Sequence, residues 1–179
     1  MKNSDNLIWL DLEMTGLDPD IHAIIEIGCA VTDSNLKLIK EGPVFVIHQS
    51  QETLDLMDPW CIKQHGKSGL TRKVQESKVS LREAEEKTLA FLMEYCEEKA
   101  SPLCGNSIGQ DRRFLDKYMP KLNAFFHYRN VDVSTIKELV RRWYPPESQA
   151  PEKTKTHHVM DDIRESIGEL QHYRQKIFK

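Results

Sequence analysis

The sequence predicts a mixed α/β fold in which a five-stranded sheet is flanked by helices. Three strand-like segments follow one another within the first 47 residues, which is typical of a meander. Helical and strand-like segments then alternate to the end of the chain, a pattern that adds strands to one sheet and packs helices on its faces. Because a domain has about 150 residues, we expect residues 1–179 to form a single domain.

The predicted strands are recognised by alternation and by their β-branched residues. The segment Leu7 to Glu13 alternates, with apolar side chains on one side and Trp9, Asp11 and Glu13 on the other. A turn at residues 15–19 ends this first strand. The other strands are expected at Ala23 to Thr32, Leu36 to Ile47 with an interruption at Gly42-Pro43, Pro102 to Ser107, and Tyr128 to Val133.

Capping signals mark the predicted helices. Asp58-Pro59 is typical of an N-cap followed by a first-turn proline, and Gly66 is expected to end that short helix. Ser80 and Glu83 form a capping box that opens a helix running to about Lys99. A further helix is expected at Gln110 to Tyr118, where Pro120 stops it. Another begins at a cap at Ser134 or Thr135 and ends at Trp143. The last helix is expected at Val159 to Ile177, after a loop at residues 145–156.

Composition excludes several classes of protein. No apolar run approaches the roughly 18 residues that cross a bilayer, so we expect no membrane insertion. The net charge of -3 is too low for electrostatic tracking along a long nucleic acid. The four cysteines are too far apart for a zinc site, and we expect free thiols in a reducing cytosol: Cys29, Cys61, Cys96 and Cys104.

Three acidic residues near predicted strand ends are candidates for a site. Asp11 and Glu13 are two residues apart on a strand and so share one face. A half-buried strand with a solvated polar face shows the same alternation, although Trp9 on that face argues against plain surface. Asp111 lies where the fourth strand meets a helix, which is where α/β sheets place their sites. Taken alone, Asp111 fits better an acid that complements a helix dipole.

The last helix separates two neighbouring aspartates. At about 100° per residue, Asp161 lies opposite the apolar stripe and faces solvent, whereas Asp162 lies at its edge and can reach the sheet. His157 and His158 precede this helix, and either could serve the same region. The stripe itself consists of Ile163, Ile167, Leu170 and Ile177.

Carboxylates that converge without cysteine ligands suit Mg²⁺ or Mn²⁺ better than zinc. Two such ions would hold the attacking and leaving oxygens in a phosphoryl displacement. A histidine with a pKa near 6.5 could take the proton from the attacking water. The competing interpretation is a non-enzymatic binding module whose carboxylates are ordinary surface residues.

The order Asp-x-Glu, Asp, and His-x-x-x-x-Asp resembles the DEDDh superfamily of 3′-to-5′ exonucleases. Longer segments resemble the oligoribonucleases within it, and the resemblance covers nearly the whole chain. These segments are WLDLEMTGLD at 9–18, IIEIGCAVTD at 24–33, GNSIGQDRRFLDKYMP at 105–120, HYRNVDVSTIKELVRRW at 127–143 and THHVMDDIRES at 156–166.

The resemblance implies an RNase H-like exonuclease fold and a two-metal hydrolase of very short RNA, diribonucleotides above all. It makes Asp11, Glu13, Asp111 and Asp162 the ligands of two Mg²⁺ or Mn²⁺ ions and His157 the general base. Hydrolysis would release nucleoside 5′-monophosphates. The oligoribonucleases are cytoplasmic homodimers, so the resemblance also implies a second copy of the chain.

Substrate-holding positions of the family also find matches. Leu17 and Trp60 would pack on the bases, although a satellite core is the plainer interpretation of these two alone. Tyr128 matches an aromatic residue contributed across the dimer interface. The cluster that grips the 5′-phosphate is matched by His65, Ser107, Arg129, Ser134 and Thr135.

Three positions depart from the family pattern, namely Lys155, His158 and Val159. His158 therefore competes with His157 for the role of base. The alternative function within the superfamily is an exonuclease that acts on longer single-stranded RNA or DNA 3′ ends.

Overall fold

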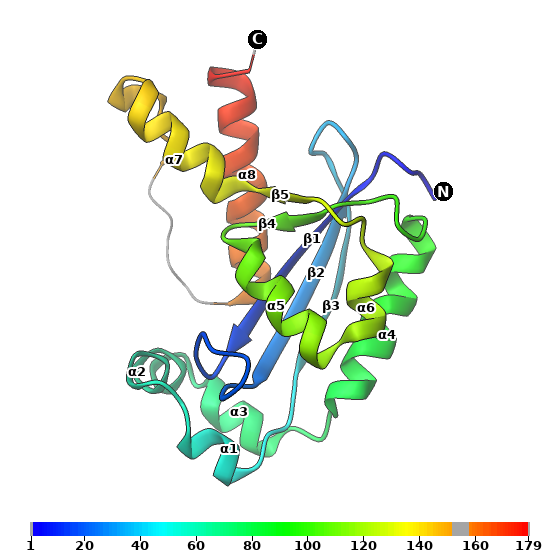
Figure 1. The fold of residues 1–179 in the computed structure, drawn as a ribbon, viewed down its shortest axis with the longest axis vertical. Helices are drawn as coiled ribbons and strands as arrows, with labels where there is room; N and C mark the ends of the chain where they lie inside the picture. The colour runs from blue at the N-terminus through cyan, green and yellow to red at the C-terminus, as the bar shows by residue number, and fades with distance from the viewer. Residues whose placement is uncertain (1, 152–157, 179) are drawn as a thin grey trace.

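The computed structural model describes residues 2–151 and 158–178, and within them a five-stranded sheet lies between two layers of helices (Figure 1). The strand order is β3-β2-β1-β4-β5, so β1 lies in the middle. β1 pairs antiparallel with β2 and parallel with β4. The predicted mixed α/β sheet with flanking helices is therefore confirmed.

All five predicted strands form, with bounds close to those expected. Gly42-Pro43 does not interrupt the third strand, as had been expected, because the strand continues through a shift in its pairing with β2 between Gly28 and Ala30. Proline is tolerated there because β3 is an edge strand. The strands are β1 (Leu7–Met14), β2 (Ile24–Thr32), β3 (Leu38–Val46), β4 (Leu103–Gly105) and β5 (Asn130–Asp132).

The helices include three that the sequence did not predict, α1, α3 and α6. The capping box is confirmed, since Ser80 Oγ accepts a hydrogen bond from the Glu83 N–H at 3.1 Å. The helices are α1 (Gln51–Asp55), α2 (Pro59–Ser68), α3 (Leu70–Glu76), α4 (Leu81–Tyr95), α5 (Ile108–Tyr118), α6 (Pro120–Phe125), α7 (Val133–Trp143) and α8 (Val159–Lys176).

Several predicted helix ends were wrong for identifiable reasons. α2 runs past Gly66 and ends before Gly69, whose φ of 75° provides the left-handed C-cap. α7 is capped by Asp132, whose side chain accepts from the Ser134 N–H, rather than by a hydroxyl residue. Pro120 ends α5 and also begins α6, since proline fits a first helical turn. α4 ends at Tyr95, earlier than expected.

Two apolar layers position the site. α4, α5 and α6 cover one face of the sheet, and α7 and α8 cover the other (Figure 1). The second layer buries Trp9 completely, and its indole N–H donates to Thr32 Oγ1 at 3.0 Å. The face of β1 that carries Asp11 and Glu13 is therefore covered by α8 and is not a solvated surface.

The remaining expectations concern the loop before α8, the cysteines and membranes. The described part of that loop contains one turn of 3₁₀ helix, Pro146–Ser148, and residues 152–156 lie outside the described residues. The four cysteines are free and buried, as expected. None of the helices in the described ranges has the length and apolar character needed to span a bilayer.

Candidate active site

Three carboxylates meet at the carboxyl end of β1. Asp11 and Glu13 come from β1 itself, and Asp162 comes from the first turn of α8. One oxygen of each lies within 4.8 Å of the others, and all three side chains are half-buried. Asp161 turns away and accepts a hydrogen bond from Arg164 Nη1 at 2.8 Å. The structure thus brings together the three acids that the strand alternation and helix phasing had singled out.

Asp111 lies next to this cluster, where its charge acts on Glu13. Its Oδ1 accepts a hydrogen bond from the Leu12 N–H at 3.0 Å, and the residue is only 6% exposed. β4 pairs with β1 only as far as Trp9, so Asp111 provides an acceptor for β1 beyond the end of β4. This contact locks the start of α5 to the strand that carries Asp11 and Glu13.

Burial and mutual repulsion both disfavour the ionised forms of these acids. Burial, followed by the charges of Asp162, Glu26 and Asp111, raises the pKa of Glu13 to about 8. Burial likewise raises the pKa of Asp111 to about 7, although the Leu12 N–H opposes that shift. Without a cation, full ionisation of this cluster is therefore unfavourable near neutral pH.

A divalent cation fits these residues. The donors are oxygens alone, which suits Mg²⁺ or Mn²⁺ and not a soft metal. Their spacing allows one ion to touch Asp11, Glu13 and Asp162 at once. The charge of the ion would offset the burial and the repulsion that raise the pKa of Glu13.

Two residues of β2 place the start of α8, and sequence reasoning missed both. Gly28 is the pairing partner of Asp11, and a Cβ at this position would lie 2.8 Å from Val159 Cγ2. Glu26, the partner of Glu13, is 5% exposed and accepts a hydrogen bond from the Val159 N–H. The signal in the sequence was an acid within an otherwise apolar strand, because a buried acid needs a specific partner.

The histidines occupy different places relative to the acids. His157 lies outside the described residues, and His158 is the exposed N-cap residue of α8. His65, on α2, is 1% exposed and its Nε2 lies 2.9 Å from the Met14 carbonyl oxygen, to which it can only donate. Its Nδ1 lies 3.9 Å from Glu13 Oε2. The structure therefore places His65 beside the acidic cluster.

Two exposed apolar side chains flank the same end of β1. Leu17 is 69% exposed and Trp60 is 59% exposed. The Asp58 N–H donates to the Thr15 carbonyl at 2.8 Å, which joins the start of α2 to the loop after β1. The Leu17 carbonyl in turn accepts a hydrogen bond from Gln110 Nε2. Both side chains are thus exposed to solvent near the carboxylates. Neither belongs to a satellite core.

Hydroxyl groups gather where β4 and β5 end. Ser107 Oγ lies 3.2 Å from Ser134 Oγ, and the Ser107 N–H donates to Asp132 Oδ1 at 2.9 Å. Ser134 Oγ donates to Asn106 Oδ1 at 3.0 Å, and Thr135 follows as an exposed residue on α7. Since β1, β4 and β5 run parallel, these groups lie at the same sheet edge as the carboxylates.

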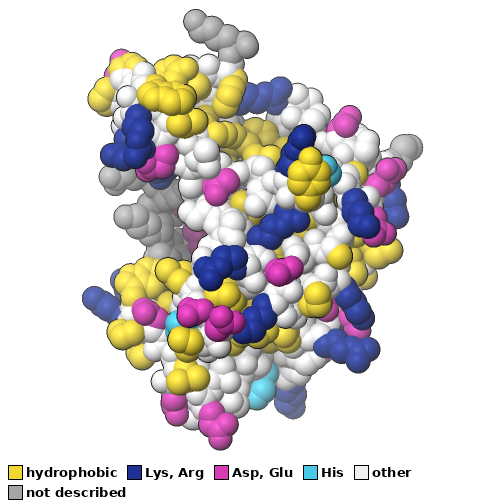
Figure 2. Space-filling model, viewed as in Figure 1, with side chains coloured by type: hydrophobic (Ala, Val, Ile, Leu, Met, Phe, Trp, Pro, Cys, Tyr) yellow, Lys and Arg dark blue, Asp and Glu magenta, His cyan; other side chains and the backbone are white. Residues whose placement is uncertain are grey.

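Tyr128 and Arg129 lie in the loop before β5. Tyr128 is 74% exposed, and the Arg129 guanidinium lies 5.3 Å from the centre of its ring. Basic side chains spread over α5 and this loop in the middle of the face shown in Figure 2. This charge suits phosphate, even though the whole chain is slightly acidic.

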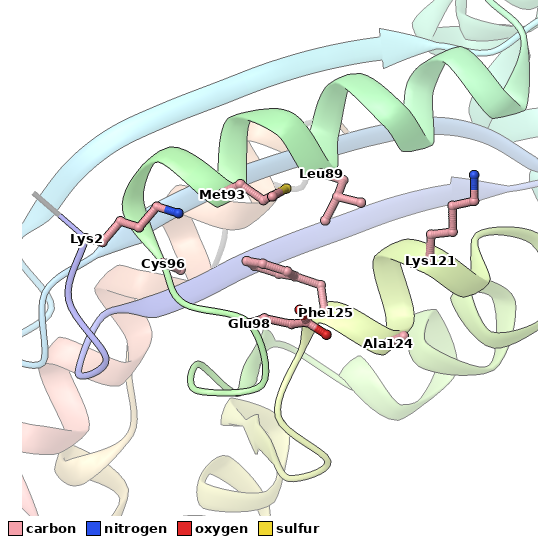
Figure 3. A pocket seen from close by; sticks show the side chains of 8 residues that line it. All are labelled: Lys2, Leu89, Met93, Cys96, Glu98, Lys121, Ala124 and Phe125. Carbon is pink, nitrogen blue, oxygen red and sulfur yellow. The ribbon is translucent and has the colours of Figure 1, made fainter.

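A separate hollow of about 480 Å³ lies between α4 and α6. Leu89, Met93 and Phe125 point into it, and Lys2 and Lys121 stand at its two ends (Figure 3). Its lining includes none of the candidate site residues. The chemistry described above therefore does not extend to this hollow.

Comparison with known proteins agrees with this geometry. Residues 8–170 match the family described as exonuclease, RNase_T. The chain is 59% identical to an oligoribonuclease from Marinobacter nauticus over 179 residues, which are all of this chain and 99% of that protein. It is 58% identical to an oligoribonuclease from Pseudomonas aeruginosa over the same shares, and 58% identical to one from Vibrio cholerae over 177 residues, 99% of this chain and 98% of that one.

Solved structures share the fold at low sequence identity. Exonuclease I from Methylocaldum szegediense matches 97% of this chain with a TM-score of 0.73 and 16% identity. E. coli exonuclease I in complex with a dA16 oligonucleotide matches with a TM-score of 0.75 and 13% identity. This chain spans only 41% of each of those proteins. The likeness to the oligoribonucleases covers both chains almost completely, and the chain therefore belongs to the oligoribonuclease family of 3′-to-5′ exoribonucleases.

Proposed function

We propose that this chain, as a single exonuclease domain, hydrolyses very short RNA from the 3′ end, diribonucleotides above all, to nucleoside 5′-monophosphates. The observation that carries the proposal is the meeting of Asp11, Glu13 and Asp162 within 4.8 Å in a member of the oligoribonuclease family. Exposed apolar side chains and a hydroxyl cluster at the same sheet edge support a short substrate that contacts both.

The four acids hold two divalent ions, Mg²⁺ or Mn²⁺, in this proposal. Such ions supply charge for the attacking and leaving oxygens of an in-line displacement. Asp11, Glu13 and Asp162 lie within 4.8 Å of one another, and Asp111 is held next to them by its bond to the Leu12 N–H. Water adds to the phosphorus, the bond from phosphorus to the 3′ oxygen breaks, and that oxygen leaves with the shortened RNA.

We assign the general base to His157, which takes the proton from the attacking water. The described neighbour His158 begins α8 one turn before Asp162, and the Asp162 N–H donates to its carbonyl at 3.0 Å. The chain therefore enters α8 beside the acids. We expect His157→Ala to lower kcat by about a hundredfold or more, and His158→Ala to lower it much less. The reverse ranking would assign the base to His158.

Both ends of a dinucleotide find residues suited to them. Leu17 and Trp60 pack on the bases. This contact does not depend on sequence, because every base has a ring face on which a side chain can stack. The proposed 5′-phosphate site contains Ser107, Arg129, Ser134 and Thr135, with His65 assigned to it by family resemblance although it adjoins Glu13. A site closed at both ends penalises longer RNA.

We further propose a cytoplasmic homodimer in which Tyr128 reaches the site of the partner subunit. The support is the 74% exposure of Tyr128 and the apolar surface at the end of α7 (Figure 2). There Leu139, Trp143 and the C-cap residue Tyr144 are exposed. Four free thiols suit a reducing compartment. Light scattering is expected to give the mass of two copies.

Substrate length tests the proposed function most directly. We expect a 5′-phosphorylated diribonucleotide to be cleaved at least about tenfold faster than a seven-residue RNA, because the longer chain does not fit between the two ends. The measurement is kcat/KM for each RNA with Mn²⁺, and a chelator should abolish both reactions. Equal rates on longer RNA or on single-stranded DNA would support the alternative, a general single-strand exonuclease.

A further inference from the structure

Arg112 holds the loop that precedes β5. Its Nη2 donates to the His127 carbonyl at 3.0 Å, and its Nη1 donates to the Tyr128 carbonyl at 3.2 Å. The same Nη1 donates to Asn130 Oδ1 at 2.5 Å. A planar guanidinium can serve several acceptors in fixed directions, which a lysine ammonium cannot. Nη1 also lies 3.5 Å from the Arg129 carbonyl oxygen. One half-buried side chain thus contacts three consecutive backbone carbonyls and the first residue of β5.

This loop presents two of the proposed substrate contacts. The rings of His127 and Tyr128 lie 4.4 Å apart, and the Arg129 N–H donates to His127 Nδ1 at 3.2 Å. With its carbonyls turned toward Arg112, the loop directs the Tyr128 ring and the Arg129 side chain outward into solvent. Arg112 of α5 therefore determines the conformation of the loop through its backbone carbonyls.

Arg112 directly follows Asp111, which bonds to the β1 backbone. On a helix these two side chains point about 100° apart, so α5 contacts β1 with one residue and the loop with the next. α5 therefore links the strand of the acidic cluster to the loop that carries Arg129.

We propose that Arg112 is a positioning residue for recognition of the 5′-phosphate of the substrate. The inference rests on the proposed function, because Arg129 binds that phosphate only if the substrate is a 5′-phosphorylated oligonucleotide. Arg112 does not touch the substrate. It keeps the loop that carries Arg129 in the position that recognition of the 5′-phosphate requires.

The test compares Arg112→Lys with Arg113→Lys. Arg113 is the adjacent exposed arginine, and its Nη1 donates to Gln110 Oε1 at 3.0 Å on its own helix. We expect Arg112→Lys to raise KM for a 5′-phosphorylated diribonucleotide about tenfold, with kcat within about twofold of the original chain. The preference for this RNA over the same RNA with a 5′-hydroxyl should fall by a similar factor. Arg113→Lys should leave both quantities unchanged.

The design separates failure of this inference from failure of the proposed function. If the original chain shows no preference for the 5′-phosphate, the proposed function is at fault, whatever the variants do. If it shows the preference and Arg112→Lys keeps it with an unchanged KM, the role of Arg112 is disproved. A fall in kcat with the 5′-phosphate preference unchanged would equally disprove it.

Asn130→Ala provides a second variant in case Arg112→Lys does not fold. It removes one acceptor of the Arg112 guanidinium at an exposed position. We expect the same change in 5′-phosphate preference at a smaller size, about twofold to threefold. Calorimetry should show unchanged Mn²⁺ binding in both variants, because the acidic cluster keeps its own contacts. An unchanged preference in Asn130→Ala would contradict the proposal.

Discussion

The acidic cluster and the exposed rim around it are built in opposite ways. Asp11, Glu13 and Asp162 come from segments about 150 residues apart and depend on the buried contact of α8 with the sheet. Leu17 and Trp60 on the rim are exposed, and hydrogen bonds of neighbouring backbone groups hold them in place. Chemistry therefore depends on the core of the fold, whereas substrate contact depends on local loops that can change without unfolding it.

The largest expected effect is in the cluster, and α8 offers a matched pair. Asp162→Asn should lower kcat by about a thousandfold or more, because it removes a charged oxygen ligand for the ions. Asp161→Asn, one residue earlier and bonded to Arg164, should change activity by less than about twofold. Turnover of a labelled diribonucleotide measures both. Equal losses in the two variants would place the chemistry elsewhere.

A smaller effect is expected on the rim. Trp60→Ala should raise KM by about tenfold to a hundredfold with little change in kcat, because stacking on one base contributes roughly 1–3 kcal/mol. Ile62→Ala on the same helix is the control, since Ile62 is 55% exposed and lies outside the proposed site. Steady-state kinetics of both variants would test whether the rim contributes to substrate binding alone and the core to the chemistry. A fall in kcat for Trp60→Ala would show that the rim takes part in the chemistry.

The smallest expected effect is a pH dependence confined to the cluster. Glu13 has an ordinary pKa of 4.5 that is raised to about 8 in the folded metal-free chain. The folded state therefore holds the proton more tightly than the unfolded state, and this contribution to stability is lost as the pH rises through 8. Mg²⁺ binds the ionised form, so its stabilising effect should be larger at pH 9 than at pH 6.

Thermal unfolding with a chelator and with Mg²⁺ at the two pH values measures this dependence. The metal-free chain should unfold several degrees lower at pH 9, and Mg²⁺ should restore most of the difference. Asp162→Asn should weaken the response to Mg²⁺. A stabilisation by Mg²⁺ that does not vary with pH would mean that these carboxyls are already ionised without the metal.

Local patterns in the sequence predicted most of the cluster. The alternation of β1 set Asp11 and Glu13 on one face, and the phase of the last helix distinguished Asp162 from Asp161. The predicted meander of the first three strands is confirmed, whereas the places of β4 and β5 in the sheet were not predicted. The three additional helices were missed because short helices without strong periodicity have no clear signal. The helix cap at Asp132 was missed because nearby hydroxyl residues offered an equally good local pattern.

By itself the sequence determined which side chains share a face, because strand and helix periods act within a few residues of the chain. Only the tertiary structure decided that the polar face of β1 lies under α8, that His65 adjoins Glu13, and that Arg112 holds the loop of Tyr128. Each of these depends on a contact between residues far apart in the chain. Such contacts are selected by the packing of the whole core, and no local pattern encodes them.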